Sequence, residues 1–287
     1  MTTITAKDEL PDLSIIITFR AAHASRVAAL GEVLRHYAEL PQIEVVVVEQ
    51  DGVPAALPAF PDACKRLFVF NPGPFNKSWG LNVGARQVER GLLLFVDADL
   101  LLAPMAVLQA VRLCRSRVVA ANPFDRLVDL AEQETERLRS GAQPLDWNRS
   151  DARTTRRENE VLNFCGGAFA IRRDTFLALG GCDERFLGWG AEDDAMAIKL
   201  HRSGHTLGQV EGSTALHLWH AQDRSTTFAQ PHYADNLAMA KALTALDDSA
   251  FRFQCEVQRQ LMGHPRKYEL AAMPVQLDAK PIRAASL

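Results

Sequence analysis

The sequence contains little that would suit a secreted, membrane-spanning or nucleic-acid-binding protein. Its cysteines are few, odd in number and scattered, without a C-x-x-C pair; they are Cys64, Cys114, Cys165, Cys182 and Cys255. Such a set is typical of a reducing compartment and gives no support to a structural zinc site. The first residues lack a basic start followed by an apolar run, so we expect no secretory signal and a soluble, cytoplasmic protein.

Three further absences narrow the class of protein. No apolar run approaches the roughly 18 residues needed to span a bilayer, so any membrane association is expected to be peripheral. The net charge is −3 and no basic stripe is present, which argues against a nucleic acid as the main partner. Neither a G-x-G-x-x-G fingerprint nor a P-loop lysine motif occurs, which argues against NAD enzymes and P-loop ATPases.

The sequence does contain enough apolar residues for one large α/β domain. The chain has 287 residues, of which 47% are hydrophobic, and this length suits a single domain with appendages. Strands are predicted at 13–17, 43–48, 67–70, 92–96 and 118–121, and helices at 24–40, from 75 to about 90 and at 104–115. This alternation predicts right-handed crossovers and a doubly wound, mostly parallel sheet flanked by helices.

The second half of the chain is less regular. Residues 123–160 are dense in charged side chains and are predicted to be an insert with a helix over roughly 127–139. Beyond it we predict a strand at 161–171 interrupted by Gly166-Gly167, a short helix at 174–180, a helix from 192 to about 203, two strands within 206–219 and a helix at 232–246. One domain is therefore expected over 1–250, with halves at 12–122 and 161–247, followed by a C-terminal tail at 251–287.

The most informative stretch is the apolar run 92–96, which is followed by Asp97 and Asp99. Carboxylates just past the C-terminal end of a buried parallel strand lie at the sheet edge where α/β proteins bind ligands. Two unpaired carboxylates would be costly to bury there, so a positive partner is expected. A divalent cation carrying a polyphosphate fits best, because hard cations prefer carboxylate oxygens. The alternative is that both acids cap the next helix and face water.

Three acids in a row, Glu192, Asp193 and Asp194, follow a Gly-Trp-Gly turn at 188–190 and open a predicted helix. Acids in a first turn are favoured by the helix dipole, which is the simple structural explanation. Trp189 adds a functional one, since a large ring between glycines is suited to stack on the C–H face of a sugar. A carboxylate beside that ring can accept a proton from a sugar hydroxyl.

Two histidines, His217 and His220, follow a predicted strand near its end. A single histidine is most often structural or exposed, but this pair is a metal signal, and with Asp99 it offers both oxygen and nitrogen ligands. That donor set favours Mn²⁺ over Mg²⁺ or Ca²⁺. Phe75 and Lys77, ahead of another predicted helix, can hold a base and a phosphate, or can instead be a hydrophobic staple and an exposed lysine.

Taken together, these stretches resemble a glycosyltransferase of the Rossmann-like GT-A fold, with a family 2-like layout. The second half is similar to the galactosyltransferase C-terminal module shared by β-1,4-galactosyltransferases and bacterial chondroitin-type polymerases. The matching motifs run in the family's order from residue 13 to residue 224; they are Ile17-Thr-Phe-Arg20, Glu49-Gln50, Phe75-Asn-Lys77, Leu81-Asn-Val-Gly84, Phe95-Val-Asp-Ala-Asp99, Gly166-Gly167, Gly188-Trp-Gly-Ala-Glu-Asp-Asp194 and His220-Ala-Gln-Asp-Arg224.

The resemblance implies a role for each matched residue. The uridine nucleotide of a UDP-sugar is expected at Thr18, Phe19, Arg20, Asp51, Phe75, Lys77, Asn82, Asp97 and Ala98. A cation, Mn²⁺ or Mg²⁺, is expected on Asp99 and His220, with His217 as a third ligand and Asp97 supporting the site. Asp193 is implied as the catalytic base within the acidic group Glu192, Asp193 and Asp194, and Trp189, Gly190 and Gly167 are implied as acceptor-binding residues.

The implied function is transfer of a hexose or N-acetylhexosamine, with inversion, from a UDP-sugar to a hydroxyl of a glycan or glycolipid acceptor. Three alternatives stay open: a retaining transferase on the same fold, like polypeptide N-acetylgalactosaminyltransferases, a sugar nucleotidyltransferase, or a glycan-binding protein without catalysis. One departure from the family concerns the second arginine that often follows closely behind Arg20. Here Ala21 and Ala22 take that place, and Arg26 comes late.

Overall fold

The computed structural model describes residues 10, 12–154, 166–221 and 230–272. The centre of the protein is a sheet of seven strands in the order β10-β6-β9-β4-β1-β2-β3. The strands are β1 (Leu13–Phe19), β2 (Glu44–Asp51), β3 (Cys64–Phe70), β4 (Leu92–Val96), β6 (Ala120–Asn122), β9 (Ala168–Arg172) and β10 (Leu207–Gln209). Neighbours pair in parallel except at β9, which runs antiparallel to β4 and β6. The predicted mostly parallel α/β architecture is confirmed.

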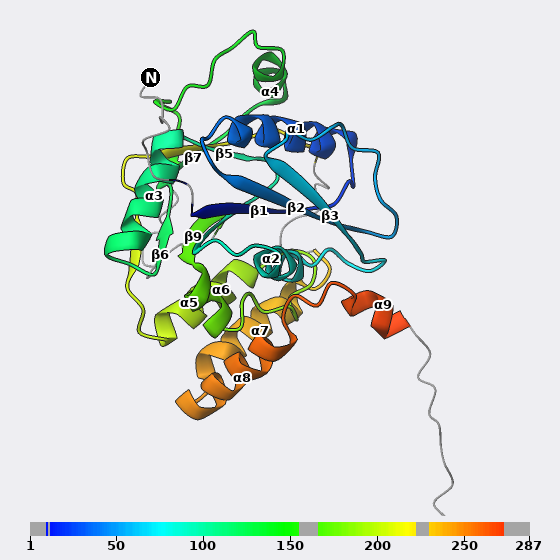
Figure 1. Cartoon of the computed structure of the whole chain (residues 1–287), viewed down its shortest axis with the longest axis vertical. Helices are drawn as coiled ribbons and strands as arrows, with labels where there is room; N and C mark the ends of the chain where they lie inside the picture. The colour runs from blue at the N-terminus through cyan, green and yellow to red at the C-terminus, as the bar shows by residue number, and fades with distance from the viewer. Residues whose placement is uncertain (1–9, 11, 155–165, 222–229, 273–287) are drawn as a thin grey trace, which may run out of the picture.

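Helices cover both faces of this sheet, with α1 above and α2 below the strands in Figure 1. One face carries α1 (Ala24–Ala38) and α3 (Pro104–Ser116), and the other carries α2 (Lys77–Arg86), α5 (Arg173–Ala178) and α6 (Glu192–Arg202). Successive residues of β1 enter opposite cores: Ile15 and Ile17 pack on the α1 side and Ile16 on the α2 side. A strand buried on both faces reads as a continuous apolar run, which is why β1 could be predicted.

Two glycines allow α2 to pack directly on β1. A Cβ added at Gly80 would overlap the Thr18 hydroxyl, and one at Gly84 would overlap the Ile16 side chain. Larger residues at either position would push the helix away from the sheet. The close packing fixes Lys77, the first residue of α2, beside the carboxyl ends of the parallel strands.

A second sheet of four strands has the order β5-β11-β7-β8. Its strands are β5 (Leu100–Leu102), β7 (Arg126–Asp129), β8 (Arg153–Thr154) and β11 (Thr214–His217). The chain passes from the first sheet to the second at residues 97–99, between β4 and β5. Because β11 pairs antiparallel with β5, His217 lies opposite Leu100, and the Leu218 N–H donates to the Asp99 carbonyl at 2.8 Å. The pairing of these short strands brings the histidines to the aspartates.

Residues 126–129 correct part of the sequence prediction. They were expected to belong to a partly helical insert, but they form β7, and the helix α4 (Glu132–Arg139) begins only after it. Leu127 and Val128 are the apolar residues of this strand, so its local pattern is weak. It forms because pairing with β11 on one side and β8 on the other provides partners for its backbone N–H and C=O groups.

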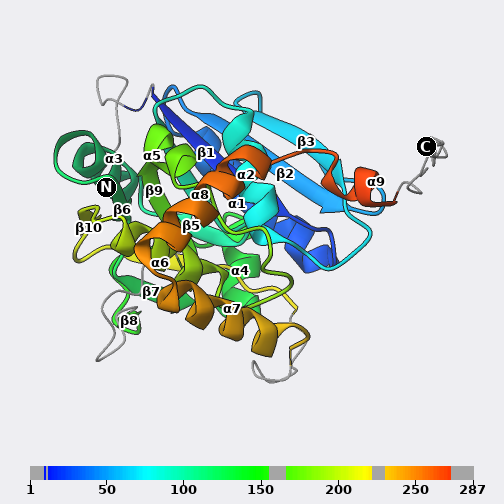
Figure 2. The same cartoon turned by 90° about the horizontal axis from the view of Figure 1, so that it is seen from below.

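The C-terminal region is also more ordered than predicted. After α7 (Tyr233–Ala245) come α8 (Asp248–Leu261) and α9 (Lys267–Ala272), within the stretch expected to be a tail. The view from below in Figure 2 shows α6, α7 and α8 grouped on this side of the protein. Phe251 and Cys255 of α8 pack with Ala195 of α6 and Leu243 of α7.

Smaller differences concern boundaries. β1 continues to Phe19, β3 begins at Cys64, and α2 ends at Arg86 rather than near residue 90. Residues 161–165 of the strand predicted at 161–171, and the motif residues 222–224, lie outside the described residues. Across the described ranges, no helix is both long enough and apolar enough to cross a bilayer.

Candidate active site

Asp99, His217 and His220 come together at the junction of the two sheets. One potential ligand atom from each lies within 4.8 Å of the others. His220 Nε2 is 3.1 Å from Asp99 Oδ2, and His217 Nε2 is 3.5 Å from Asp99 Oδ1. Asp99 and His220 are buried, with 6% and 8% exposure. Two imidazole nitrogens and a carboxylate oxygen form a donor set suited to a borderline divalent cation such as Mn²⁺.

Asp129, the last residue of β7, holds His217 in position. The His217 Nδ1–H donates to Asp129 Oδ1 at 3.0 Å, which turns Nε2 toward Asp99. A carboxylate behind a histidine ligand is a common outer partner in metal sites. Sequence reasoning missed Asp129, because it lies in the charged segment 123–160 and reaches His217 only through the β7–β11 pairing.

The carboxylates and imidazoles of this group stabilise one another's charged forms. Burial alone would raise the pKa of Asp99, but the hydrogen bonds from His217 and His220 outweigh it and hold that pKa well below its ordinary value. Burial also disfavours a charged His217, yet Asp129 and Asp99 raise the pKa of His217 to about 10. The hydrogen bond from His217 lowers the pKa of Asp129 to about 2. A cation binding here would meet an ionised Asp99 and would displace imidazole protons.

A second cluster surrounds Lys77, where the first turns of α2 and α6 meet. Lys77 Nζ lies 3.1 Å from Asp97, 3.3 Å from both oxygens of Asp193 and 3.7 Å from Glu192. Burial alone would lower the pKa of Lys77, but the three acids raise it well above its ordinary value. Burial raises the pKa of Asp193 to about 8, Glu192 and Asp97 add to this, and Lys77 opposes it. A carboxylate that titrates near neutral pH is suited to general base work.

A cleft of about 500 Å³ joins the two clusters. Its lining brings together most of the predicted metal, catalytic and acceptor-binding residues; these are Asp97, Asp99, Gly167, Trp189, Gly190, Glu192, Asp193, Asp194 and His217. The lining also includes residues that sequence reasoning did not select, among them Asn122, Phe124, Asp129, Arg153 and Tyr233. Asp194 is the exposed member of the acidic triplet, whereas Asp193 lies against Lys77.

The loop at 187–190 presents an aromatic surface beside this cleft. Trp189 is 52% exposed and stacks on Tyr233 of α7, with ring centroids 5.6 Å apart and planes at 21°. Gly190 has a φ of +107°, and a Cβ there would lie 2.6 Å from the Tyr233 ring. The buried Asn236 amide donates to the carbonyls of Leu187 and Trp189. The ring pair is therefore held in place by α7 in the wall of the cleft, and aromatic faces of this kind are suited to stack on a sugar.

Arg20 has a different setting from the one the resemblance implied. Its guanidinium donates to three backbone carbonyls, those of Gln50, Asn71 and Gly73, at 2.8 to 2.9 Å. It also lies 5.8 Å from the centroid of the Phe75 ring. Arg20 thus fixes the loop that follows β3 and positions Phe75. In the described structure three of its five N–H donors bond to backbone carbonyls of the protein, which gives it a supporting role. Phosphate binding by Arg20 stays a prediction.

The remaining predicted nucleotide residues have three different settings. Thr18, Phe19 and Ala98 are buried, so a ligand would reach them mainly through their backbone. Asp51 is half-buried at the end of β2 and accepts a hydrogen bond from the next N–H. Asn82 is fully buried and does not line the cleft; its amide is bonded to the loop at 182–184. That bonding gives Asn82 a structural function, which the resemblance did not imply.

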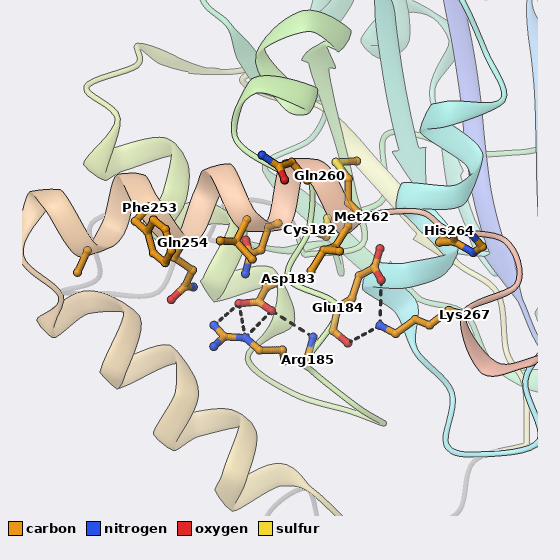
Figure 3. Close-up of a pocket in the computed structure, with 14 residues that line it drawn as sticks. Cys182, Asp183, Glu184, Arg185, Phe253, Gln254, Gln260, Met262, His264 and Lys267 are labelled. Atoms are coloured by element: carbon orange, nitrogen blue, oxygen red, sulfur yellow. Dashed lines mark hydrogen bonds and ion pairs between the residues drawn. The ribbon is translucent and has the colours of Figure 1, made fainter. Parts of the chain in front are cut away.

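A larger cavity, of about 710 Å³, lies between α8 and the loop at 182–185 (Figure 3). Its charged residues pair within the wall: Arg185 donates to Asp183 at 2.6 Å, and Lys267 donates to Glu184 at 2.9 Å. The rest of the lining comes mainly from α8, which contributes apolar side chains together with three glutamines. Paired charges leave little to act on a substrate, so we place the candidate site in the smaller acidic cleft.

Comparison with known proteins bears on this site. A family model described as the N-terminal domain of galactosyltransferase matches residues 150–221, which carry the acidic triplet and both histidines. Polypeptide N-acetylgalactosaminyltransferase 8 of Drosophila melanogaster is 25% identical over 232 residues, covering 74% of this chain and 39% of its own length. Validoxylamine A glucosyltransferase of Streptomyces hygroscopicus subsp. jinggangensis is 26% identical over 226 residues, covering 69% of this chain and 53% of its own length. The chain spans about half or less of these relatives.

A solved structure has the same fold. The structure of GalNAc-T7 with UDP, GalNAc and Mn²⁺ superposes with a TM-score of 0.52 at 15% identity, covering 80% of this chain and 47% of that chain. The protein therefore has a GT-A fold, as predicted. Residues 150–221 are similar to a galactosyltransferase domain, which confirms the resemblance inferred from the motifs in this half of the chain.

Proposed function

We propose that the protein is a metal-dependent, inverting glycosyltransferase that moves a hexose or N-acetylhexosamine from a UDP-sugar to a hydroxyl of a glycan or glycolipid. The observation that carries this proposal is a single cleft with Asp99 and His217 in its wall together with Asp193. The relatives support the substrate class, since two are named as sugar transferases and the GalNAc-T7 structure holds UDP, GalNAc and Mn²⁺.

The donor set fits a divalent cation. Asp99, His217 and His220 would hold it, with Asp129 orienting His217 from behind. Histidine nitrogens favour Mn²⁺ over Mg²⁺ at such a site. When bound, the cation supplies positive charge that offsets the charge developing on the departing diphosphate.

The chain's own residues account for the remaining chemistry. Asp193 accepts the proton of the acceptor hydroxyl as that oxygen bonds to the anomeric carbon and the bond to the UDP oxygen breaks. A single displacement of this kind inverts the anomeric centre. Lys77 lies against both Asp193 and Asp97, and so fixes the base while reducing repulsion between the acids. The Trp189 and Tyr233 rings cover the sugars and limit access of water.

Substitution of Asp193 tests this assignment. Asp193→Asn is expected to lower kcat about 10³-fold, because it removes the base, while the Kd for UDP with Mn²⁺ changes less than about threefold. The measurements are UDP release from a set of UDP-hexoses and UDP-N-acetylhexosamines with a glycan panel, and calorimetric titration of UDP. Asp248→Asn is the control, since Asp248 also lies in a first helical turn but is 81% exposed. Near-normal turnover of Asp193→Asn would refute the role of base.

A retaining transferase is the second candidate, and the match to a polypeptide N-acetylgalactosaminyltransferase favours it. NMR of the product decides between the two. A β-linked product from an α-linked UDP-sugar supports inversion, whereas an α-linked product refutes single displacement with Asp193 as base. UDP release that needs an acceptor would also separate a transferase from a sugar nucleotidyltransferase or a non-catalytic glycan-binding protein.

A further inference from the structure

Arg26, in the first turn of α1, reaches the same atoms that would hold a cation. Its Nη2 lies 3.6 Å from Asp99 Oδ2, and its Nη1 lies 3.4 Å from His220 Nδ1. The side chain is 36% exposed, so it has room to move. The preceding residue, Ser25, accepts a hydrogen bond from the Ala221 N–H at 2.9 Å. The first turn of α1 therefore contacts both the backbone beside His220 and the His220 ring.

His220 Nδ1 lies between two groups, one of which requires a proton on this nitrogen and the other a free lone pair. The Ala221 carbonyl, at 3.2 Å, only accepts and needs a proton on Nδ1, whereas the Arg26 guanidinium only donates and needs the lone pair there. In a neutral ring, a proton on Nδ1 leaves Nε2 free to bind a cation. A bond from Arg26 to Nδ1 instead puts the proton on Nε2, where it donates to Asp99. The Arg26 contact and ligation by His220 Nε2 therefore exclude one another.

Charge adds to this competition. The guanidinium is a cation, and it lies beside the carboxylate that a divalent cation needs. Two positive groups at Asp99 repel unless an anion separates them. Arginine pairs with phosphate oxygens in a fork geometry, so the diphosphate of a nucleotide is a suitable anion. A nucleotide would thus draw Arg26 away from Asp99 and His220.

We propose that Arg26 is a positioning residue that couples cation binding to nucleotide binding. Its guanidinium competes with the divalent cation for Asp99 and His220, and it moves to the diphosphate when a nucleotide arrives. Arg26 then weakens the binding of Mn²⁺ alone and strengthens the binding of Mn²⁺ and UDP together. This inference rests on the proposed function, and linkage makes the coupling measurable from either ligand.

Calorimetric titration of Mn²⁺ with and without saturating UDP tests the proposal. Arg26→Ala is expected to bind Mn²⁺ alone about threefold or more tightly than the unsubstituted chain, and its UDP-dependent gain in Mn²⁺ affinity should fall about fivefold or more. Arg26→Lys should lie between the two, because it keeps the charge but not the fork. Arg35→Ala is the matched control on α1, since Arg35 is 60% exposed and pairs with Glu32. It should behave like the unsubstituted chain.

Two results would overturn this inference. They are an unchanged or weaker affinity of Arg26→Ala for Mn²⁺ alone, and an unchanged gain on adding UDP. Arg26→Gln provides the same comparison where melting curves show that Arg26→Ala does not fold. An unsubstituted chain that binds no Mn²⁺ refutes the proposed function itself, and the coupling with it. An unsubstituted chain that binds Mn²⁺ in the same way as Arg26→Ala refutes the coupling alone.

Discussion

Lys77→Met would leave Asp97, Glu192 and Asp193 facing one another without their shared cation. Each ion pair, at 3.1 to 3.7 Å, has a gross attraction of roughly 5 kcal/mol at an effective dielectric constant of about 20. Desolvation offsets most of that, and removing one partner of a buried pair costs about 3–5 kcal/mol. Because the Asp97 and Asp193 side chains are 36% and 30% exposed, we expect the lower end, a loss of about 3 kcal/mol.

The loss should depend on pH. Burial raises the pKa of Asp193 to about 8, and Lys77 opposes that rise, so removing Lys77 raises the pKa further. A carboxyl group whose folded-state pKa exceeds its unfolded value of about 4 lowers the free energy of unfolding at pH values above about 4. This cost grows as the pH rises and reaches its full size above the folded-state pKa. The deficit of Lys77→Met is therefore expected to be larger at pH 8 than at pH 5.

Urea unfolding followed by tryptophan fluorescence at the two pH values measures this deficit. The control is Lys65→Met, whose ammonium lies 2.7 Å from Glu44 on a side chain that is 69% exposed, and which should cost at most about 1 kcal/mol. Adding Asp193→Asn to Lys77→Met should restore about 1 kcal/mol or more. A Lys77→Met deficit no larger than that of the control, or one independent of pH, would show that Lys77 is not the counter-ion of these acids.

Three further predictions concern the site. His220→Ala should weaken Mn²⁺ binding at least about tenfold by calorimetry, because it removes the imidazole 3.1 Å from the Asp99 carboxylate; unchanged affinity contradicts the ligand assignment. The transfer rate should rise from about pH 7 to about pH 9, because Asp193, with its pKa of about 8, must be ionised to accept a proton. Bound Mn²⁺ should shift this rise in rate to lower pH. A rate that falls over that range contradicts the role of base. Gly190→Ala should lower stability by about 2 kcal/mol and reduce transfer, because of its φ of +107° and the Tyr233 ring 2.6 Å from the new Cβ. Gly204→Ala, with a φ of +69° and open space around it, should cost about 1 kcal/mol by urea unfolding, and equal losses in the two variants would exclude the clash.

The first half of the fold could be predicted because β1, β2 and β4 are buried on both faces. Such strands appear as uninterrupted apolar runs, and the segments between them have helical periodicity. β1 and β4 lie side by side in parallel, so the residues after each strand meet at one edge, as expected for Asp97 and Asp99. A metal site could be predicted from the aspartates at that edge of the sheet together with His217 and His220.

α8 could not be predicted in the same way. Phe251, Phe253, Cys255 and Val257 recur every second residue, a spacing that suggests a strand rather than a helix. Only Phe251 and Cys255 are buried, against α6 and α7, whereas Phe253 is 70% exposed. Packing of those two residues, rather than periodicity, selects the helix.

The site residues that sequence reasoning missed depend on contacts between distant segments. Asp129 reaches His217 through strand pairing, and Arg26 reaches His220 from the start of α1. Arg20 and Asn82 occupy matched motif positions, yet their polar atoms bond to loops of this protein. A motif identifies the residue type at a position, but only the surrounding chain determines whether that side chain is available to a ligand.

The crossing between sheets at residues 97–99 also bears on how the protein folds. Asp99 gains its histidine neighbours only once β11, a segment distant in sequence, has docked on β5. Contacts between such distant segments carry a large loop-closure cost and tend to form late. An ion that recognises only the completed cluster stabilises the finished topology over any half-assembled intermediate. Metal binding would therefore stabilise the completed fold of the newly made chain, in addition to its role with a substrate.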